Sequence, residues 1–119
     1  ATVLLRYGDL TVLTDPNVIH AGDHVHLGYG LTAERLLEPA LELEELPPID
    51  LVLLSPLHGD HFDQVVEARL DKATPIVFYS HGTNGWKSYK AAVLAVARGY
   101  KPVFYLREGW AGWTAAQLP

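Results

Sequence analysis

The sequence predicts a single α/β domain in which helices pack on a mixed sheet of about five strands. The second half alternates short aliphatic runs with helical segments, which is typical of parallel strands joined by crossovers. The first residues have the pattern of a β-hairpin, which adds an antiparallel pair. The chain has 119 residues, 49% of them hydrophobic and 19% charged, which is enough for one hydrophobic core. We therefore expect one domain over residues 1–119.

The N-terminal segment predicts the antiparallel hairpin. Residues 2–7 and 10–14 are rich in β-branched and aromatic side chains, which favour strands. Gly8 and Asp9 lie between them and suit a type II′ turn, because glycine accepts the positive φ of its first central position. Pro16 ends the second strand, since proline has no N–H to donate to a ladder.

The segment that follows is less regular. Residues 17–30 hold three histidines and several glycines, a composition that predicts a loop. Residues 32–38 favour a short helix with Thr32 as its N-cap, interrupted by Pro39. Residues 40–44 alternate apolar and charged side chains, which favours an exposed strand or extended segment.

A central strand is expected over residues 51–54. All four residues are aliphatic, and a continuous aliphatic run is typical of a strand buried on both faces. Ser55 and Pro56 end this strand. A short amphipathic helix is then expected over residues 62–70, with Asp60 as its N-cap.

The last third of the chain alternates strand and helix. Residues 75–79 and 102–106 predict strands, and residues 86–98 predict a helix that the following glycine stops. A turn then leads into a short terminal helix that contains Trp110 and Trp113. These two tryptophans could cover either the core or a partner, and tryptophans near a terminus more commonly close the core.

Charge and composition exclude several classes of function. The net charge is −5 and the nine lysines and arginines are scattered, so nucleic acid and anionic membrane surfaces are not expected as partners. No apolar run approaches the roughly 20 residues that span a bilayer, and no signal peptide is visible. We therefore expect a cytoplasmic protein. The absence of cysteine excludes disulfides and thiol catalysis, and the absence of methionine as well favours a processed or engineered chain.

The most specific motif follows the central strand. Residues 55–61 read Ser-Pro-Leu-His-Gly-Asp-His, which places two imidazoles and a carboxylate just beyond a buried strand. Ligands and catalytic groups gather beyond the carboxyl ends of such strands. This segment, the opening hairpin and residues 13–16 together resemble the metallo-β-lactamase superfamily over residues 1–77. The signature of that family is His-x-His-x-Asp-His.

The resemblance implies a metal site from which one ligand is missing. His58, Asp60 and His61 match the last three signature positions, but Pro56 stands at the first histidine and has no ligand atom. Only His81 follows as a later histidine. The candidate ligands that remain for a zinc ion are His58, Asp60, His61, His81 and Asp15. A structural alternative is that Asp60 caps the helix and the histidines are solvated.

The end of the chain resembles a second family, the rhodanese-like sulfurtransferases, over residues 75–119. The resemblance rests on the strand at 75–79, the loop at 80–85, the segment Trp-Lys-Ser-Tyr-Lys-Ala-Ala at 86–92, and the closing pattern through Leu-Pro. In that family a cysteine directly after the strand carries a persulfide. Ser80 stands at this position, so sulfur transfer is not expected.

The loop after Tyr79 could still bind an anion. Its backbone N–H groups precede a helix N-terminus, where the helix dipole attracts sulfate or phosphate. The residues of this candidate site are Ser80, His81, Gly82, Thr83, Asn84 and Gly85. The alternative is that Ser80 and Asn84 simply cap the helix.

The combination favours a chimeric scaffold. Two half-domains of different families meet near residues 75–78, and Pro56 and Ser80 remove an essential residue from each parental site. We therefore expect an engineered α/β scaffold with no catalytic residues and no cofactor. The alternatives are a residual metal-dependent hydrolase with zinc and an anion-binding loop of rhodanese type. Incomplete parental layers also favour a homodimer, which would bury leftover apolar surface.

Overall fold

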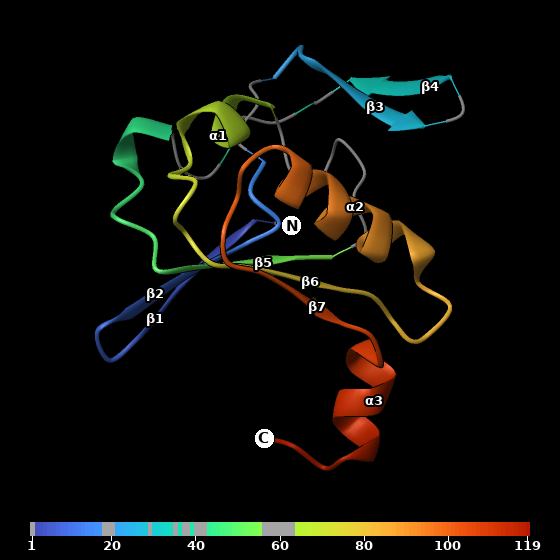
Figure 1. Ribbon diagram of the computed structural model, residues 1–119. Coiled ribbons are helices and arrows are strands. Elements are labelled where there is room, and N and C mark those ends of the chain that lie inside the picture. The colour runs from blue at the N-terminus through green and yellow to red at the C-terminus, as the bar shows by residue number, and fades with distance from the viewer. Residues whose placement is uncertain are drawn as a thin grey trace.

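The protein is a mixed α/β domain built on one five-stranded sheet, as predicted (Figure 1). The computed structural model describes residues 2–17, 21–28, 30–34, 36, 39, 43–55 and 64–119. The strand order is β1-β2-β5-β6-β7. These strands are β1 (Val3–Tyr7), β2 (Leu10–Thr14), β5 (Leu51–Leu54), β6 (Ile76–Tyr79) and β7 (Val103–Leu106).

The sheet is antiparallel at one edge and parallel elsewhere. β1 pairs with β2 antiparallel, with Leu5 opposite Val12, which confirms the N-terminal hairpin. Gly8 in its turn has a φ of 59°, the sign that the turn requires. β2, β5, β6 and β7 run parallel, with Val12 opposite Leu51 at the junction of the hairpin with the parallel strands. The sheet therefore combines both kinds of pairing.

Helices cover one face of this sheet. α1 (Gln64–Arg69) and α2 (Trp86–Ala97) lie on the same side, whereas α3 (Gly109–Ala115) lies on the other side, beyond the end of β7 (Figure 1). α2 confirms the helix expected at 86–98, and the next glycine, Gly99, has a φ of 90°. Within the part of the chain that is described, no helix is long and apolar enough to cross a membrane.

A small second sheet replaces the loop and helix expected between the hairpin and the central strand. β3 (His24–Gly28) pairs antiparallel with β4 (Leu31–Glu34), and both lie beyond α1 and α2 (Figure 1). Thr32 pairs with His26, so the prediction that it caps a helix is wrong. Gly30, with a φ of 76°, supports the turn between the strands, and cross-strand hydrogen bonds outweigh a weak helix preference.

The predictions for the two segments that flank the central strand differ in their outcome. Leu43–Glu45 form a 3-10 helix, η1, where an extended segment was expected, and residues 40–42 lie outside the described part. α1 agrees with the helix expected near 62–70. Residues 56–63, which include its predicted cap Asp60, lie outside the described part.

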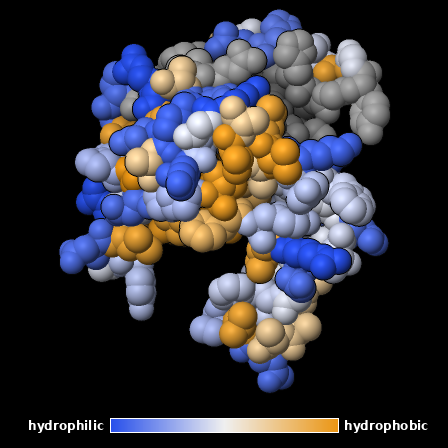
Figure 2. Space-filling view, in the orientation of Figure 1, coloured by the Kyte–Doolittle hydropathy of each residue, from blue (hydrophilic) through white to orange (hydrophobic). Residues whose placement is uncertain are grey.

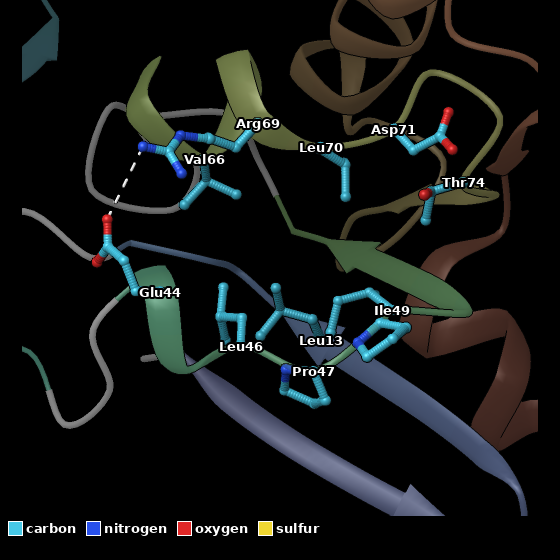
Figure 3. A pocket seen from close by; sticks show the side chains of 11 residues that line it. Leu13, Glu44, Leu46, Pro47, Ile49, Val66, Arg69, Leu70, Asp71 and Thr74 are labelled. Carbon is cyan, nitrogen blue, oxygen red and sulfur yellow. Dashed lines mark ion pairs between the residues drawn. The ribbon is translucent and has the colours of Figure 1, made fainter.

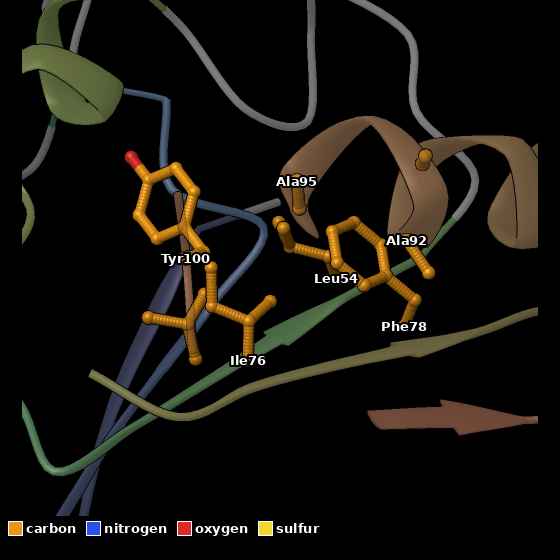
Figure 4. Close-up of a cluster of buried hydrophobic side chains, with 8 residues drawn as sticks. Leu54, Ile76, Phe78, Ala92, Ala95 and Tyr100 are labelled. Carbon is orange, nitrogen blue, oxygen red and sulfur yellow. The ribbon is translucent and has the colours of Figure 1, made fainter. Parts of the chain in front are cut away.

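The core lies between the sheet and α2 (Figure 4). The strands contribute Val52, Leu54, Ile76 and Phe78. Leu54, Ile76 and Phe78 lie on the side of the sheet that faces the helix (Figure 4). α2 contributes three alanines, whose small side chains allow its backbone to approach the sheet closely. The buried residues of this core are Val52, Leu54, Ile76, Phe78, Ala91, Ala92, Ala95 and Tyr100.

The opposite face of the sheet has no covering layer among the described residues, so the central strand is not buried on both faces as predicted. Val52 and Leu54 are buried, whereas Leu51 and Leu53 are half-buried. We call this surface the open face. Strand register and side-chain alternation place on it Val3, Leu5, Tyr7, Leu10, Val12, Thr14, Leu51, Leu53, Val77, Tyr79, Phe104 and Leu106. Of these side chains, only that of Val12 is buried, at 8% exposure.

The two C-terminal tryptophans do not close the core. Trp110 and Trp113 on α3 are 57% and 38% exposed, respectively, so the alternative in which they close the core is wrong. α3 is held by its backbone at the carboxyl end of β6 rather than by burial of these indoles. Both side chains therefore remain on the surface. The helix that carries them, α3, lies on the side of the sheet opposite α1 and α2, which is the side of the open face (Figure 1).

Candidate functional site

The loop between β6 and α2 is folded around a buried serine. Ser80, the first residue after β6, is only 4% exposed. Its Oγ donates a hydrogen bond of 2.9 Å to the carbonyl oxygen of Gly82. The same carbonyl accepts a hydrogen bond of 3.0 Å from the N–H of Gly85. The hydroxyl of Ser80 is therefore occupied within its own loop.

Gly85 is required at the end of this loop by the position of Ser80. A Cβ atom at residue 85 would lie 1.8 Å from the Oγ of Ser80, so any side chain would displace the serine. Gly85 is also the N-cap of α2, and no side chain donates or accepts a capping hydrogen bond there. The alternative in which Ser80 and Asn84 cap the helix is therefore wrong, because the hydroxyl of Ser80 bonds to Gly82 instead.

The start of α3 holds the loop from the other side. The N–H of Trp110 donates to the carbonyl oxygen of Ser80 at 2.9 Å, and the N–H of Ala111 donates to that of His81 at 2.8 Å. Gly109 has a φ of 58°, and a Cβ there would lie 2.2 Å from the Ser80 oxygen. Only glycine therefore permits this approach.

A second buried serine fixes the first turn of α2 to β6. Ser88 is fully buried, and its Oγ donates a hydrogen bond of 2.7 Å to the carbonyl oxygen of Tyr79. This bond joins the last residue of the strand to the helix. The strand, the loop and the helix are therefore held in one fixed arrangement.

The outer surface of the loop is suited to an anion. His81, Thr83 and Asn84 are exposed, and the N–H groups of Thr83 and Asn84 donate to no other described residue. α2 has twelve residues, and its positive dipole end points at this loop. Backbone donors and a helix N-terminus are together a favourable environment for sulfate or phosphate. Whether such an ion binds at Ser80–Gly85 stays a prediction.

A polar cluster lies at the neighbouring strand ends. The carboxylate of Asp15, after β2, accepts hydrogen bonds from the N–H and the hydroxyl of Ser55, after β5, at 2.8 and 3.0 Å. Burial and the negative charge of Asp15 raise the pKa of Tyr79 above its usual 10.0. These residues bring the carboxyl ends of three parallel strands together, directly before residues 56–63.

The predicted zinc ligands fall mostly outside the described part of the chain. His58, Asp60 and His61 belong to residues 56–63, whereas His81 is exposed on the loop after β6. Among the described residues, no group of three or more histidine and carboxylate side chains could hold a metal ion. The carboxylate oxygens of Asp15 are both engaged by the hydroxyl of Ser55, so this residue is poorly placed to serve as a further ligand.

A cavity of about 460 Å³ lies at the opposite ends of the strands (Figure 3). Most of its lining is apolar, with Leu13 on β2 facing Val66 and Leu70 (Figure 3). An ion pair of 3.8 Å between Arg69 and Glu44 bridges one side of it. No local pattern in the sequence indicates this cavity, because segments far apart in the chain form it.

The chain is thus an α/β domain in which a tight loop joins a parallel strand, β6, to a helix, α2, that packs on the same sheet. A family model for the rhodanese-like domain matches residues 41–116, well over half of the chain. The chain belongs to this family. No curated protein matches the sequence significantly.

Two solved structures share the fold. One is an isothiocyanate hydrolase from Delia radicum gut bacteria, with a TM-score of 0.64, 23% sequence identity, and coverage of 89% of this chain and 39% of that one. The other is a possible metal-dependent hydrolase from Veillonella parvula DSM 2008, with a TM-score of 0.61, 19% identity, and coverage of 87% and 38%. The chain thus spans about two fifths of the length of each.

These similarities do not divide the chain at the expected junction. The rhodanese-like match begins at residue 41, well before residue 75, and includes β5 and α1. The match to the isothiocyanate hydrolase structure covers 89% of this chain, so it must extend beyond residues 1–77 into the segment assigned to the second family. The family resemblance to rhodaneses is therefore confirmed over a longer range than predicted, and an origin from two fragments stays a hypothesis.

Proposed function

We propose that this chain is a rhodanese-like domain that binds a small oxyanion at the loop Ser80–Gly85 and transfers no sulfur. The observation that carries the proposal is the state of Ser80. It occupies the position at which the family places a persulfide cysteine, and its hydroxyl is buried and bonded to Gly82. A hydroxyl bound in this way can neither carry sulfur nor attack a substrate, whereas the loop around it keeps its shape.

The support for anion binding comes from the backbone. The N–H groups of Thr83 and Asn84 have no acceptor among the described residues, and the loop leads into the N-terminus of α2. Hydrogen bonds from Ser88 and Trp110 hold the two ends of the loop, so its donors are fixed before an ion arrives. Such preorganisation lowers the entropic cost of binding.

Titration with sulfate and with phosphate, followed by amide NMR, tests this proposal. We expect saturable shifts of the amides from His81 to Trp86. The variant Gly85→Ala should lose them, because its Cβ would displace Ser80. Thr114→Ala is the control, since its hydroxyl lies outside the loop and bonds to carbonyl groups of its own helix, and it should bind as the unmodified chain does. Shifts spread over the whole chain, or equal binding by both variants, would contradict the proposal.

Restoring the sulfur-carrying residue tests the absence of transferase activity. In a Ser80→Cys variant, the thiolate can attack the outer sulfur of thiosulfate, forming an S–S bond while sulfite leaves. We expect the variant to gain the mass of one sulfur atom and the unmodified chain to gain none. Release of sulfite by the unmodified chain would show that another residue performs the chemistry.

A metal-dependent hydrolase is the second candidate function. Its support is the fold likeness to two structures described as an isothiocyanate hydrolase and a possible metal-dependent hydrolase. The proposed ligands are His58, Asp60, His61 and His81, with zinc as the ion. Calorimetric titration with zinc tests it. Binding tighter than micromolar that is lost in a His58→Ala and His61→Ala double variant would support the hydrolase, and an absence of heat would end it.

The remaining possibility is a scaffold without any activity, assembled from two fragments. Its support is that Pro56 and Ser80 each replace a residue that the resembled families use. This possibility predicts that the unmodified chain binds neither anions nor zinc and releases no sulfite from thiosulfate. Anion binding, zinc binding or sulfite release by the unmodified chain rules it out.

A further inference from the structure

The open face is a large apolar surface without a covering layer among the described residues. Its members come from all five strands, so the surface runs across the full width of the sheet. Several of its side chains are strongly exposed, among them Leu5, Leu10 and Phe104, the last at 53%. Monomeric proteins rarely expose continuous apolar patches of more than a few hundred Å². We therefore expect a partner to cover this surface.

We propose that the partner is a second copy of this chain, packed sheet against sheet through the open face. The first argument is charge. The strand residues on this face include no lysine, arginine, aspartate or glutamate, although the chain carries a net charge of −5. A face without charge meets its own copy without repulsion, which an isologous contact requires.

The second argument is area. Tyr7, Phe104 and the two α3 tryptophans leave roughly 500 Å² exposed, since an aromatic side chain offers about 150–250 Å². The aliphatic side chains of the face add roughly 300 Å², with about 0.8 kcal/mol per buried methylene as the driving force. The total of roughly 800 Å² per copy equals the contribution of each partner to a standard protein interface.

The third argument is shape. The helices α1 and α2 cover only the other face, so two copies can bring their sheets together at the usual spacing of about 10 Å. The resulting assembly has helices outside and two sheets inside. α3 lies beside the open face, and Figure 2 shows a notch between this helix and the body of the molecule. The sheet of the partner copy would enter this notch and cover Trp110 and Trp113.

α2 carries the main rival surface. Val93, Leu94 and Val96 are exposed on the outside of this helix. Lys90 lies on the same exposed side, so two copies of this surface would bring like charges together. The open face has no such charges, which is why we favour it. The rival surface also supplies matched control residues.

Sedimentation equilibrium at micromolar concentration tests the proposal. We expect a mass of twice 13.1 kDa for the unmodified chain. Phe104→Lys and Leu5→Lys should each halve it, because each would bury a charge in the contact. Val96→Glu, at a residue that is 59% exposed on α2, should remain dimeric. Far-UV circular dichroism identifies any variant that fails to fold, and the other open-face variant then decides the result.

Thiol protection gives a second measurement that does not depend on disrupting the dimer. Because the chain has no cysteine, Phe104→Cys and Val96→Cys each provide a single reactive thiol. We expect the rate of maleimide labelling to fall with increasing protein concentration for Phe104→Cys and to stay constant for Val96→Cys. A monomer at all concentrations overturns the proposal, as does a dimer that only the residue 96 variants disturb.

Discussion

The two faces of the main sheet are built from similar residues and yet have opposite environments. On the helix side, Ile76 and Phe78 of β6 are buried beneath α2. On the open side, Val77 and Tyr79 of the same strand are only half-buried. Hydrophobicity along the strand therefore does not determine burial. The number of layers does, and the described residues supply a helical layer for only one face.

The comparison explains why a polar cluster and an apolar surface lie so close together. Tyr79 belongs to the open face, but its phenol lies close enough to Asp15 for the carboxylate charge to raise its pKa. The carboxyl ends of the strands are thus polar while the middle of the face is apolar. The proposed anion-binding loop and the proposed docking surface therefore use different residues of one small sheet.

The largest expected effect separates the two faces directly. Phe78→Ala should lower the free energy of unfolding by about 3–5 kcal/mol, because it leaves a cavity in the core. Phe104→Ala, on the open face, should cost less than about 1 kcal/mol in dilute solution, where the chain is monomeric. Urea unfolding at low protein concentration measures both. Equal losses would mean that the open face is buried within the monomer.

An intermediate effect is expected from the link between β6 and α2. Ser88→Ala should cost about 1–2 kcal/mol, because it removes a buried hydrogen bond to the carbonyl oxygen of Tyr79. The control is Thr114→Ala on α3, whose exposed hydroxyl bonds only to carbonyl groups of its own helix and which should change stability by about 0.5 kcal/mol or less. A loss as small for Ser88→Ala as for the control would mean that this bond contributes nothing net.

The smallest effect is a dependence of stability on pH. Burial and the charge of Asp15 raise the pKa of Tyr79 in the folded chain above 10.0, so the unfolded chain releases this proton first. The contribution of Tyr79 to the free energy of unfolding is therefore complete below pH 10, and it is lost as the pH rises through the pKa of the folded chain. Urea unfolding at a series of alkaline pH values should show a shallower decline for Tyr79→Phe. The same slope in both chains would contradict the raised pKa.

Local sequence patterns predicted best those elements whose ends are marked by residues within or directly beside them. The N-terminal hairpin and the helix from Trp86 follow from Gly8 and Gly99, whose positive φ values mark a turn and a helix end. The pattern failed for Leu31–Glu34, which pairs with His24–Gly28 as a strand. A four-residue strand carries too little periodicity to compete with a plausible helix start at Thr32.

The candidate site was only half accessible to sequence reasoning. The strand, loop and helix around Ser80 follow from residues that are neighbours in the chain. The contacts from Gly109 and Trp110 join residues about thirty positions apart, and no local pattern reveals them. The missing layer over Leu51 and Leu53 was likewise hidden, because an aliphatic run looks the same whether one face is covered or both.

The contact between Gly109 and Ser80 also constrains how the loop can be made and moved. During synthesis, the loop after β6 lacks its second support until the segment from Gly109 to Ala111 has left the ribosome, so its final shape is acquired late. For the same reason, a designer who transplants residues 80–85 to another strand and helix would have to carry the start of α3 with them. The shape of the loop therefore depends on two segments that are distant in the sequence, and residues 80–85 alone would not keep it.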